Sequence, residues 1–113
     1  MVKSTRLGDI YGIDDNKIQT FLGIRYGEPP INERRFKASV ASGGWKNTFE
    51  ATSFPNRAMQ LKMVDADGRK IPGKVSEDCL FMNIYTPKNM SKLAPVLVWM
   101  HGGAFKNGSA NEF

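Results

Sequence analysis

Apolar residues in the first part of the chain come in short runs that glycines interrupt. Ile10-Tyr11 leads into Gly12. The longer run Ile18–Ile24 contains Gly23 and is followed by Gly27. Short apolar runs bounded by glycine turns are typical of strands joined by tight connections. The pattern therefore predicts a small antiparallel meander over residues 1–28.

The middle of the chain has no clear periodicity. Pro29-Pro30 removes two backbone donors and predicts an extended loop after the meander. Residues 31–76 then carry several turn-forming pairs: Gly43-Gly44, Pro55-Asn56, Asp67-Gly68 and Pro72-Gly73. So long a stretch without a periodic element is unusual in a self-contained domain of this size. It favours irregular structure here and counts against an autonomous domain.

Order returns in two apolar runs near the end of the chain. Leu80–Tyr85 ends at Thr86-Pro87, and Pro95–Met100 ends at His101. The second run is continuously apolar, which is typical of a strand buried on both faces within an α/β fold. Little sequence follows it that could cover such a strand. We therefore expect residues 1–113 to be an N-terminal segment of one larger α/β domain, incomplete alone and without an internal boundary.

Composition and charge favour an ordinary globular surface. The chain has 113 residues, of which 41% are hydrophobic and 24% charged. Sixteen Lys and Arg against eleven Asp and Glu give a net charge of +5. The basic residues are scattered and do not alternate with aromatic ones, as they would along a single-stranded nucleic acid. We expect a solvated basic surface and no nucleic-acid partner.

Targeting signals and a membrane span are not apparent. The sequence MVKSTRLGDIYG at the start has no apolar core of a signal peptide. The longest apolar run, Pro95–Met100, is far shorter than the ~18 residues of a membrane helix. Cys79 is the only cysteine, so an internal disulfide is impossible and a reducing compartment is favoured. These features predict a cytoplasmic protein without a membrane span.

Candidate chemistry follows the second apolar run, at His101-Gly102-Gly103-Ala104-Phe105. A glycine pair leaving a strand lets the backbone turn sharply and point successive N–H groups into one cavity. Such donors form the oxyanion hole of many lipases and esterases, where they stabilise the negative oxygen that develops during acyl transfer. A tight turn at the end of a strand explains the same residues. These residues alone leave both interpretations open.

Several separated segments resemble the type-B carboxylesterases, the carboxylesterase/cholinesterase group of α/β-hydrolases, in the order in which that family shows them. The similar segments are FLGIRYGEPP at 21–30, Arg35-Phe36, Trp45 with Ala51-Thr52, Gln60, SEDCLFMNIYTP at 76–87 and VLVWMHGGAFKNG at 96–108. The last two segments together are highly specific for this family. The resemblance covers about the whole chain.

This resemblance implies a fold and a site. The fold is the N-terminal portion of an α/β-hydrolase, a small antiparallel meander plus the first strands of a central mixed sheet. The oxyanion donors are the backbone N–H groups of Gly103 and Ala104, and Gly102 gives the turn its freedom. Ala104 replaces the family's third glycine but keeps the N–H. The implied substrate is a small carboxylic ester, and no cofactor or metal is implied.

Other positions carry structural implications of the same resemblance. Arg35 and Glu77 match an ion pair, and a bidentate link between them would clamp the irregular region. Cys79 matches a position that is often disulfide-bonded, but Met59 stands where its partner would be. We therefore expect a buried free thiol at Cys79, without a nucleophilic role. The only histidine, His101, matches a structural position of the family.

Departures from the family pattern cluster after the meander. Arg25 replaces a proline, Gly27 an alanine, and Asn32 stands where glycine is common. We expect these changes to loosen the turn that leaves the meander without touching the chemistry.

A complete catalytic machinery is not predicted within this chain. No G-x-S-x-G nucleophile motif occurs, since Gly108-Ser109-Ala110 has no following glycine in register. In α/β-hydrolases the nucleophile, the acidic residue and the catalytic histidine all follow the oxyanion strand. We expect them in the C-terminal remainder of the same fold, so that this chain alone is inactive. Two alternatives stay open: a non-catalytic esterase-like adhesion module, and a basic binding protein.

Overall fold

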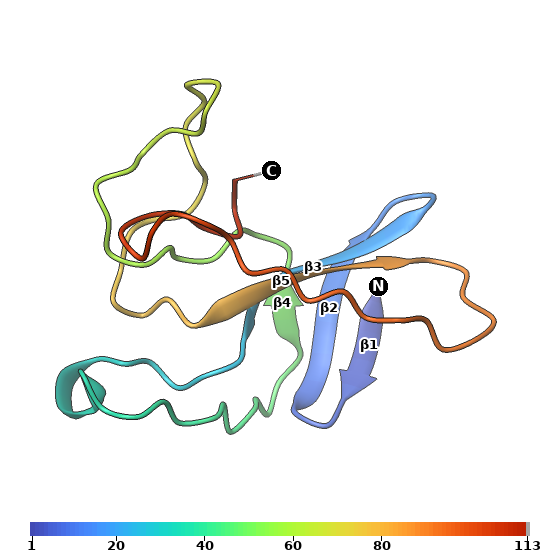
Figure 1. Cartoon of the computed structure of the whole chain (residues 1–113). Helices are drawn as coiled ribbons and strands as arrows, with labels where there is room; N and C mark the ends of the chain where they lie inside the picture. Colours follow the sequence, from blue (N-terminus) through green and yellow to red (C-terminus); the bar gives the residue numbers. More distant parts are fainter. Residues whose placement is uncertain (113) are drawn as a thin grey trace.

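The described part of the chain, residues 1–112 of a computed structural model, contains one five-stranded sheet (Figure 1). Its strands and its short 3₁₀ helix are, in chain order, β1 (Val2–Thr5), β2 (Gly8–Asp14), β3 (Ile18–Arg25), η1 (Asn32–Arg34), β4 (Phe49–Ala51) and β5 (Phe81–Pro87). The order β1-β2-β3-β5 is antiparallel throughout, and β4 pairs in parallel with β2. Long connections surround this sheet.

The predicted meander is confirmed. β1 and β2 pair from Val2 opposite Tyr11 to Thr5 opposite Gly8. The end of β2 pairs with the start of β3, beside the turn that joins them. Gly12, expected at a turn, lies within β2 instead. A Cβ there would lie 2.4 Å from a ring carbon of Phe21, so the small residue lets that ring pack over the strand.

The predicted strand near residues 80–85 is also confirmed, as β5. It pairs with β3 from Ile18 opposite Pro87 to Arg25 opposite Phe81, with an irregularity between Phe21 and Ile24. β4 was not predicted and lies in the segment expected to be irregular. Its Ala51 is fully buried in the small core with Ile10, Phe21 and Ile24.

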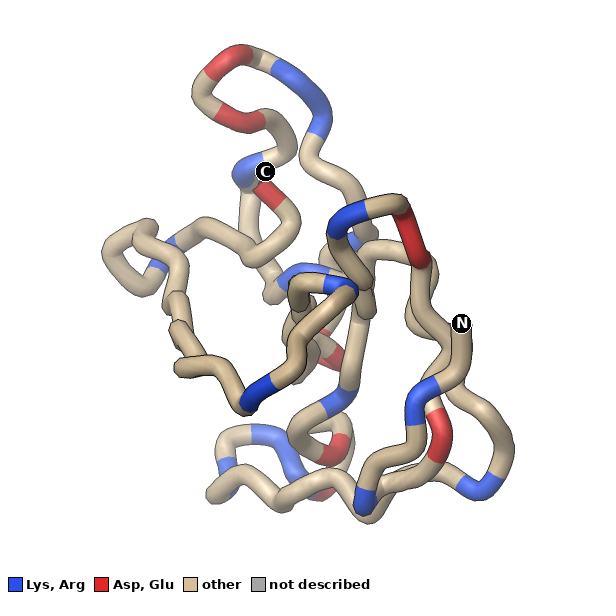
Figure 2. The backbone as a smooth tube through the Cα atoms, turned by 90° about the vertical axis from the view of Figure 1, so that its right-hand side faces the viewer, with Lys and Arg blue, Asp and Glu red and all other residues tan. Residues whose placement is uncertain are grey.

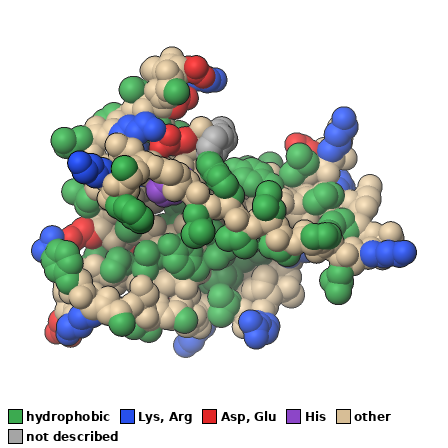
Figure 3. All heavy atoms as spheres, in the orientation of Figure 1, with side chains coloured by type: hydrophobic (Ala, Val, Ile, Leu, Met, Phe, Trp, Pro, Cys, Tyr) green, Lys and Arg blue, Asp and Glu red, His purple; other side chains and the backbone are tan. Residues whose placement is uncertain are grey.

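The expected buried strand at 95–100 is not formed, and this prediction was wrong for the chain as it stands. Leu97 is 92% exposed and Trp99 57%. A doubly buried strand needs hydrogen-bonded neighbours and cover on both faces. Within residues 1–112 no strand pairs with this run. Apolar side chains accordingly form a band across the face shown in Figure 3.

Arg25, one of the departures after the meander, makes contacts that hold the end of β3. The Arg25 guanidinium makes a bidentate ion pair with Asp78, at 2.7 and 2.9 Å. The same group lies 4.4 Å from the ring centre of Phe81. Arg25 thus ties the end of β3 to the segment that enters β5, since bidentate carboxylate pairs and cation–π contacts both fix its position.

The ion pair expected between Arg35 and Glu77 is present, through the Arg35 Nε and one carboxylate oxygen. It is not bidentate, and both side chains are exposed. The other basic residues are spread along the chain with acidic ones between them (Figure 2). Among residues 1–112 no helix has the length and apolar character needed to cross a membrane.

Candidate active site

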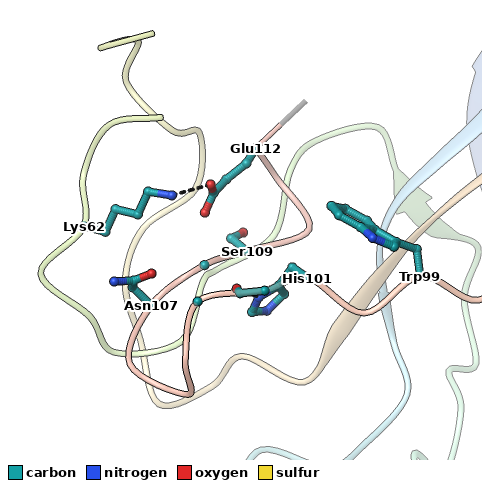
Figure 4. Close-up of a pocket in the computed structure, with 9 residues that line it drawn as sticks. Lys62, Trp99, His101, Asn107, Ser109 and Glu112 are labelled. Carbon is teal, nitrogen blue, oxygen red and sulfur yellow. Dashed lines mark hydrogen bonds and ion pairs between the residues drawn. The ribbon is translucent and has the colours of Figure 1, made fainter. Parts of the chain in front are cut away.

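A pocket of about 240 Å³ lies where the C-terminal segment meets the long loop before β5 (Figure 4). Lys62 comes from that loop, and the other lining residues come from the segment after β5. They are Trp99, His101, Gly102, Gly103, Asn107, Gly108, Ser109 and Glu112. Two of the three predicted site residues, Gly102 and Gly103, therefore line one pocket. Ala104 is exposed and does not line it.

The backbone from residue 103 to 107 forms a tight turn. Gly103 has a φ of +131°, and Ala104 and Phe105 have φ values of +52° and +58°. The Gly103 carbonyl accepts hydrogen bonds from the N–H groups of Lys106 and Asn107, at 3.0 and 3.2 Å. A Cβ on Gly103 would lie 1.8 Å from the Asn107 carbonyl oxygen. Glycine is therefore required at 103 for both φ and space.

The two predicted donors have no hydrogen-bond partner within the described chain. Neither the Gly103 N–H nor the Ala104 N–H donates a hydrogen bond to any group in the described chain. Backbone N–H groups are strong donors that rarely stay without a partner when water is excluded. Ala104 is exposed, so water can reach its N–H, and the turn leaves two successive donors without a partner in the described chain.

His101 and Ser109 are both engaged with the backbone. The His101 Nδ1 lies 2.9 Å from the Gly102 carbonyl oxygen, which it can contact as an N–H donor. The Ser109 hydroxyl is buried and accepts the Asn111 N–H at 3.0 Å. Within the described residues no base hydrogen-bonds to the Ser109 hydroxyl, so neither side chain is arranged for nucleophilic attack.

Three amide side chains that the sequence analysis did not assign to the site anchor the segment behind it. Asn111 is 2% exposed, and its Nδ2 donates to the carbonyls of Pro55 and Pro72 at 2.9 and 3.1 Å. Its Oδ1 accepts from Asn83 of β5 at 3.2 Å. Gln60 binds Gly108 through both ends of its amide. Gln60 and Asn83 had been noted only as parts of motifs, and nothing in the sequence pattern pointed to Asn111.

One ion pair closes the pocket on the side of Lys62. Its Nζ lies 2.6 Å from a Glu112 carboxylate oxygen (Figure 4). The second oxygen of Glu112 is buried and has no hydrogen-bond partner within the described chain. The described residues contain no group of three or more His, Cys, Asp and Glu arranged to hold a metal ion.

Comparison with known proteins decides the family. The sequence model of the carboxylesterase family matches residues 1–113. The chain belongs to the carboxylesterase family. Its curated relatives include a para-nitrobenzyl esterase of Bacillus subtilis (strain 168), 34% identical over 112 residues, 98% of this chain and 23% of the relative. Carboxylesterase 5A of Homo sapiens is 40% identical over 126 residues, with 98% of this chain and 22% of the relative covered.

Solved esterase structures support the same family assignment. A para-nitrobenzyl esterase superposes with a TM-score of 0.81 at 34% identity, over 95% of this chain and 21% of that one. The carboxylesterase of Geobacillus stearothermophilus gives 0.80 at 37% identity, over 96% and 21%. The chain thus spans about a fifth of the relatives it matches. The predicted fold class, an N-terminal part of an α/β-hydrolase, is confirmed.

Cys79 of this carboxylesterase segment is a free thiol, as expected, but it is half-buried and not fully buried. Burial raises the pKa of the thiol, and the nearby carboxylates of Asp78 and Glu77 raise it further. Both effects disfavour the charged thiolate. The thiol is therefore held in its neutral, poorly nucleophilic form at neutral pH.

We expect Cys79 to be alkylated slowly. In the native protein the rate with iodoacetamide should be lower than that of a free cysteine at pH 7–8. It should rise with pH and level off only above the ordinary thiol pKa, because the reactive thiolate forms later. Mass spectrometry of the labelled peptide measures the rate, and the urea-unfolded protein is the control. Native labelling as fast as in urea would contradict the assigned pKa direction.

Proposed function

We propose that this chain supplies the oxyanion hole of a serine carboxylic-ester hydrolase. The observation that carries the proposal is the pair of unpartnered N–H groups on Gly103 and Ala104, within a turn next to a pocket. Membership of the carboxylesterase family supports it. The substrate class is a small carboxylic ester, as the names of the esterase relatives suggest.

The proposed role follows from the charge that develops during acyl transfer. When a nucleophile attacks an ester carbonyl, the carbonyl oxygen becomes negative, and preorganised N–H donors stabilise it more than the neutral substrate. Gly103 and Ala104 would provide two such donors. Gly102 would provide the backbone freedom that lets the turn begin. On this proposal the nucleophilic serine, its acidic partner and its histidine come from the rest of the protein.

The test compares the intact protein with the 113-residue chain. We expect the intact protein to hydrolyse p-nitrophenyl acetate and to be inactivated stoichiometrically by a fluorophosphonate probe, which labels an activated serine. The chain alone should show neither hydrolysis nor labelling, because His101 and Ser109 are not arranged as base and nucleophile. Intact mass spectrometry measures the probe adduct in both samples.

Two results would overturn this proposal. An intact protein that neither hydrolyses the ester nor takes up the probe would instead be a non-catalytic, esterase-like interaction module. Stoichiometric labelling of the chain alone, in a sample of verified mass, would place the nucleophile within residues 1–113.

A further inference from the structure

The side-chain amide of Gln60 pairs with the main chain of Gly108 in both directions. Its Oε1 accepts the Gly108 N–H at 3.0 Å, and its Nε2 donates to the Gly108 carbonyl at 2.9 Å. The Nε2 also donates to the Ala58 carbonyl at 3.1 Å. Three hydrogen bonds therefore fix the amide plane, and the backbone of Gly108 is held as it would be by a neighbouring strand.

Gly108 in turn lies against the start of the turn that carries the proposed donors. A Cβ on Gly108 would lie 2.2 Å from the Gly102 carbonyl oxygen and 2.6 Å from the His101 Nδ1. Residues 101–108 thus close on themselves, and we name them the oxyanion loop. The backbone of Gly108 therefore approaches Gly102 so closely that no side chain fits between them, and a displacement of Gly108 toward the turn would push against Gly102.

The segment that carries Gln60 is itself anchored by a buried side chain. Arg57 is 2% exposed, and its guanidinium donates to the carbonyls of Lys62 and Gly73 at 2.8 and 3.3 Å. The first bond closes the short segment 57–62 that carries Gln60, and the second ties this segment to the chain at Gly73. Among the described side chains, only that of Gln60 hydrogen-bonds to Gly108. Gln60 therefore connects the segment anchored by Arg57 to the oxyanion loop.

From this arrangement we infer that Gln60 is a positioning residue for the oxyanion loop: its amide fixes Gly108 and thereby the placement of the Gly103 and Ala104 donors. The inference rests on the proposed function. Donors must lie within tenths of an ångström of their target to act fully, and supporting hydrogen bonds secure that precision. Gln60 itself touches no substrate.

The first experiment replaces Gln60 with methionine in the intact protein. Gln60→Met keeps the length of the side chain but removes every hydrogen bond to Gly108. We expect backbone hydrogen exchange in a peptide covering 101–108 to accelerate roughly tenfold or more. The kcat for p-nitrophenyl acetate should fall about tenfold or more, with KM within about twofold, because the lost interaction matters only in the transition state.

A matched variant separates positioning from simple loss of stability. Gln60→Glu cannot donate to the Gly108 carbonyl as a carboxylate, but a neutral carboxyl can donate there while accepting the Gly108 N–H. The ratio of variant to parent kcat should therefore recover as pH falls through the carboxyl pKa. The ionisable side chains that line the pocket, Lys62, Glu112 and His101, are the same in parent and variant, and the ratio of the two kcat values at each pH removes their shared effect.

Each outcome decides the inference. Faster exchange together with a lower kcat in Gln60→Met, and recovery of Gln60→Glu at low pH, would support it. Unchanged kcat in Gln60→Met, a lower kcat without faster exchange, or a Gln60→Glu deficit that is independent of pH would overturn it. A parent protein without esterase activity would refute the proposed function. The exchange measurement would then still decide whether Gln60 fixes the loop.

Discussion

Replacing the backbone amide of Ala104 with an ester is expected to lower kcat by about 100- to 1,000-fold in the intact protein. Incorporation of lactic acid at position 104 deletes the N–H while keeping the methyl group and the backbone shape. The lost donor is one of the two that carry the proposed oxyanion hole. The loss corresponds to about 2.7–4 kcal/mol of transition-state stabilisation. KM should change little, since the neutral carbonyl of the substrate binds this donor weakly.

Proline is unsuitable for this deletion. Ala104 has a φ of +52°, and the proline ring fixes φ near about −65°. Ala104→Pro would therefore distort the turn as well as delete the donor. Glycine is the matched side-chain control, because Ala104→Gly keeps the N–H and adopts a positive φ without strain. We expect it to stay within about tenfold of the parent kcat.

A second control covers the carbonyl that the ester also weakens. The Gly103 carbonyl accepts from Lys106 and Asn107, and an ester carbonyl is a poorer acceptor than an amide. An ester at position 106 deletes the Lys106 donor to the same carbonyl but leaves the Ala104 N–H intact. Kinetics that suffer equally in both ester variants would assign the effect to the turn and not to the donor.

Local pattern was enough to predict most of the sheet. The meander strands and β5 are marked by apolar runs between turn residues. Short turns place β1, β2 and β3 side by side, whereas β5 pairs with β3 across the long segment between them. β4 could not be predicted in this way, since it has three residues and pairs in parallel with β2. Its partner lies far away in sequence. Ala51 of β4 gives no apolar run, although it is fully buried.

The run at 95–100 shows the opposite limit. Its apolar residues indicate a strand that is buried on two faces, which is a statement about neighbours as much as about the run itself. The described chain provides no strand beside it, so Leu97 and Trp99 remain largely exposed. A sequence pattern records the environment for which a segment was selected, whether or not that environment is present.

At the candidate site, sequence predicted the residue types but not their supports. Gly102 and Gly103 were found because a glycine pair after an apolar run has a specific backbone meaning. The supporting roles of Gln60 and of the buried Asn111 could not be predicted, because each side chain bonds to a backbone group that only the tertiary structure brings close. Single amide side chains carry no periodic signal. The positive φ of Ala104 was equally invisible, since alanine rarely adopts it.

Adding a single methyl group to Gly103 is expected to lower kcat/KM by more than about 100-fold in the intact protein. The methyl carbon of Gly103→Ala would lie 1.8 Å from the Asn107 carbonyl oxygen, a backbone atom that cannot rotate away. The φ of +131° at this position adds strain for any residue with a Cβ. The turn must therefore open by an ångström or more. A displacement of that size at a catalytic donor costs about 100-fold.

Gly68→Ala is the matched control for the Gly103 experiment. Gly68 has a φ of +79°, but a Cβ there would meet nothing within 4 Å. It therefore carries the backbone strain without the collision and lies outside the pocket lining. We expect Gly68→Ala to lose at most a small amount of stability and to keep the parental kcat/KM. Steady-state kinetics and a thermal melt of the parent and both variants provide the comparison. Parental kcat/KM in Gly103→Ala, with an unchanged melt, would show that the proposed activity does not depend on the tight turn at 103–107.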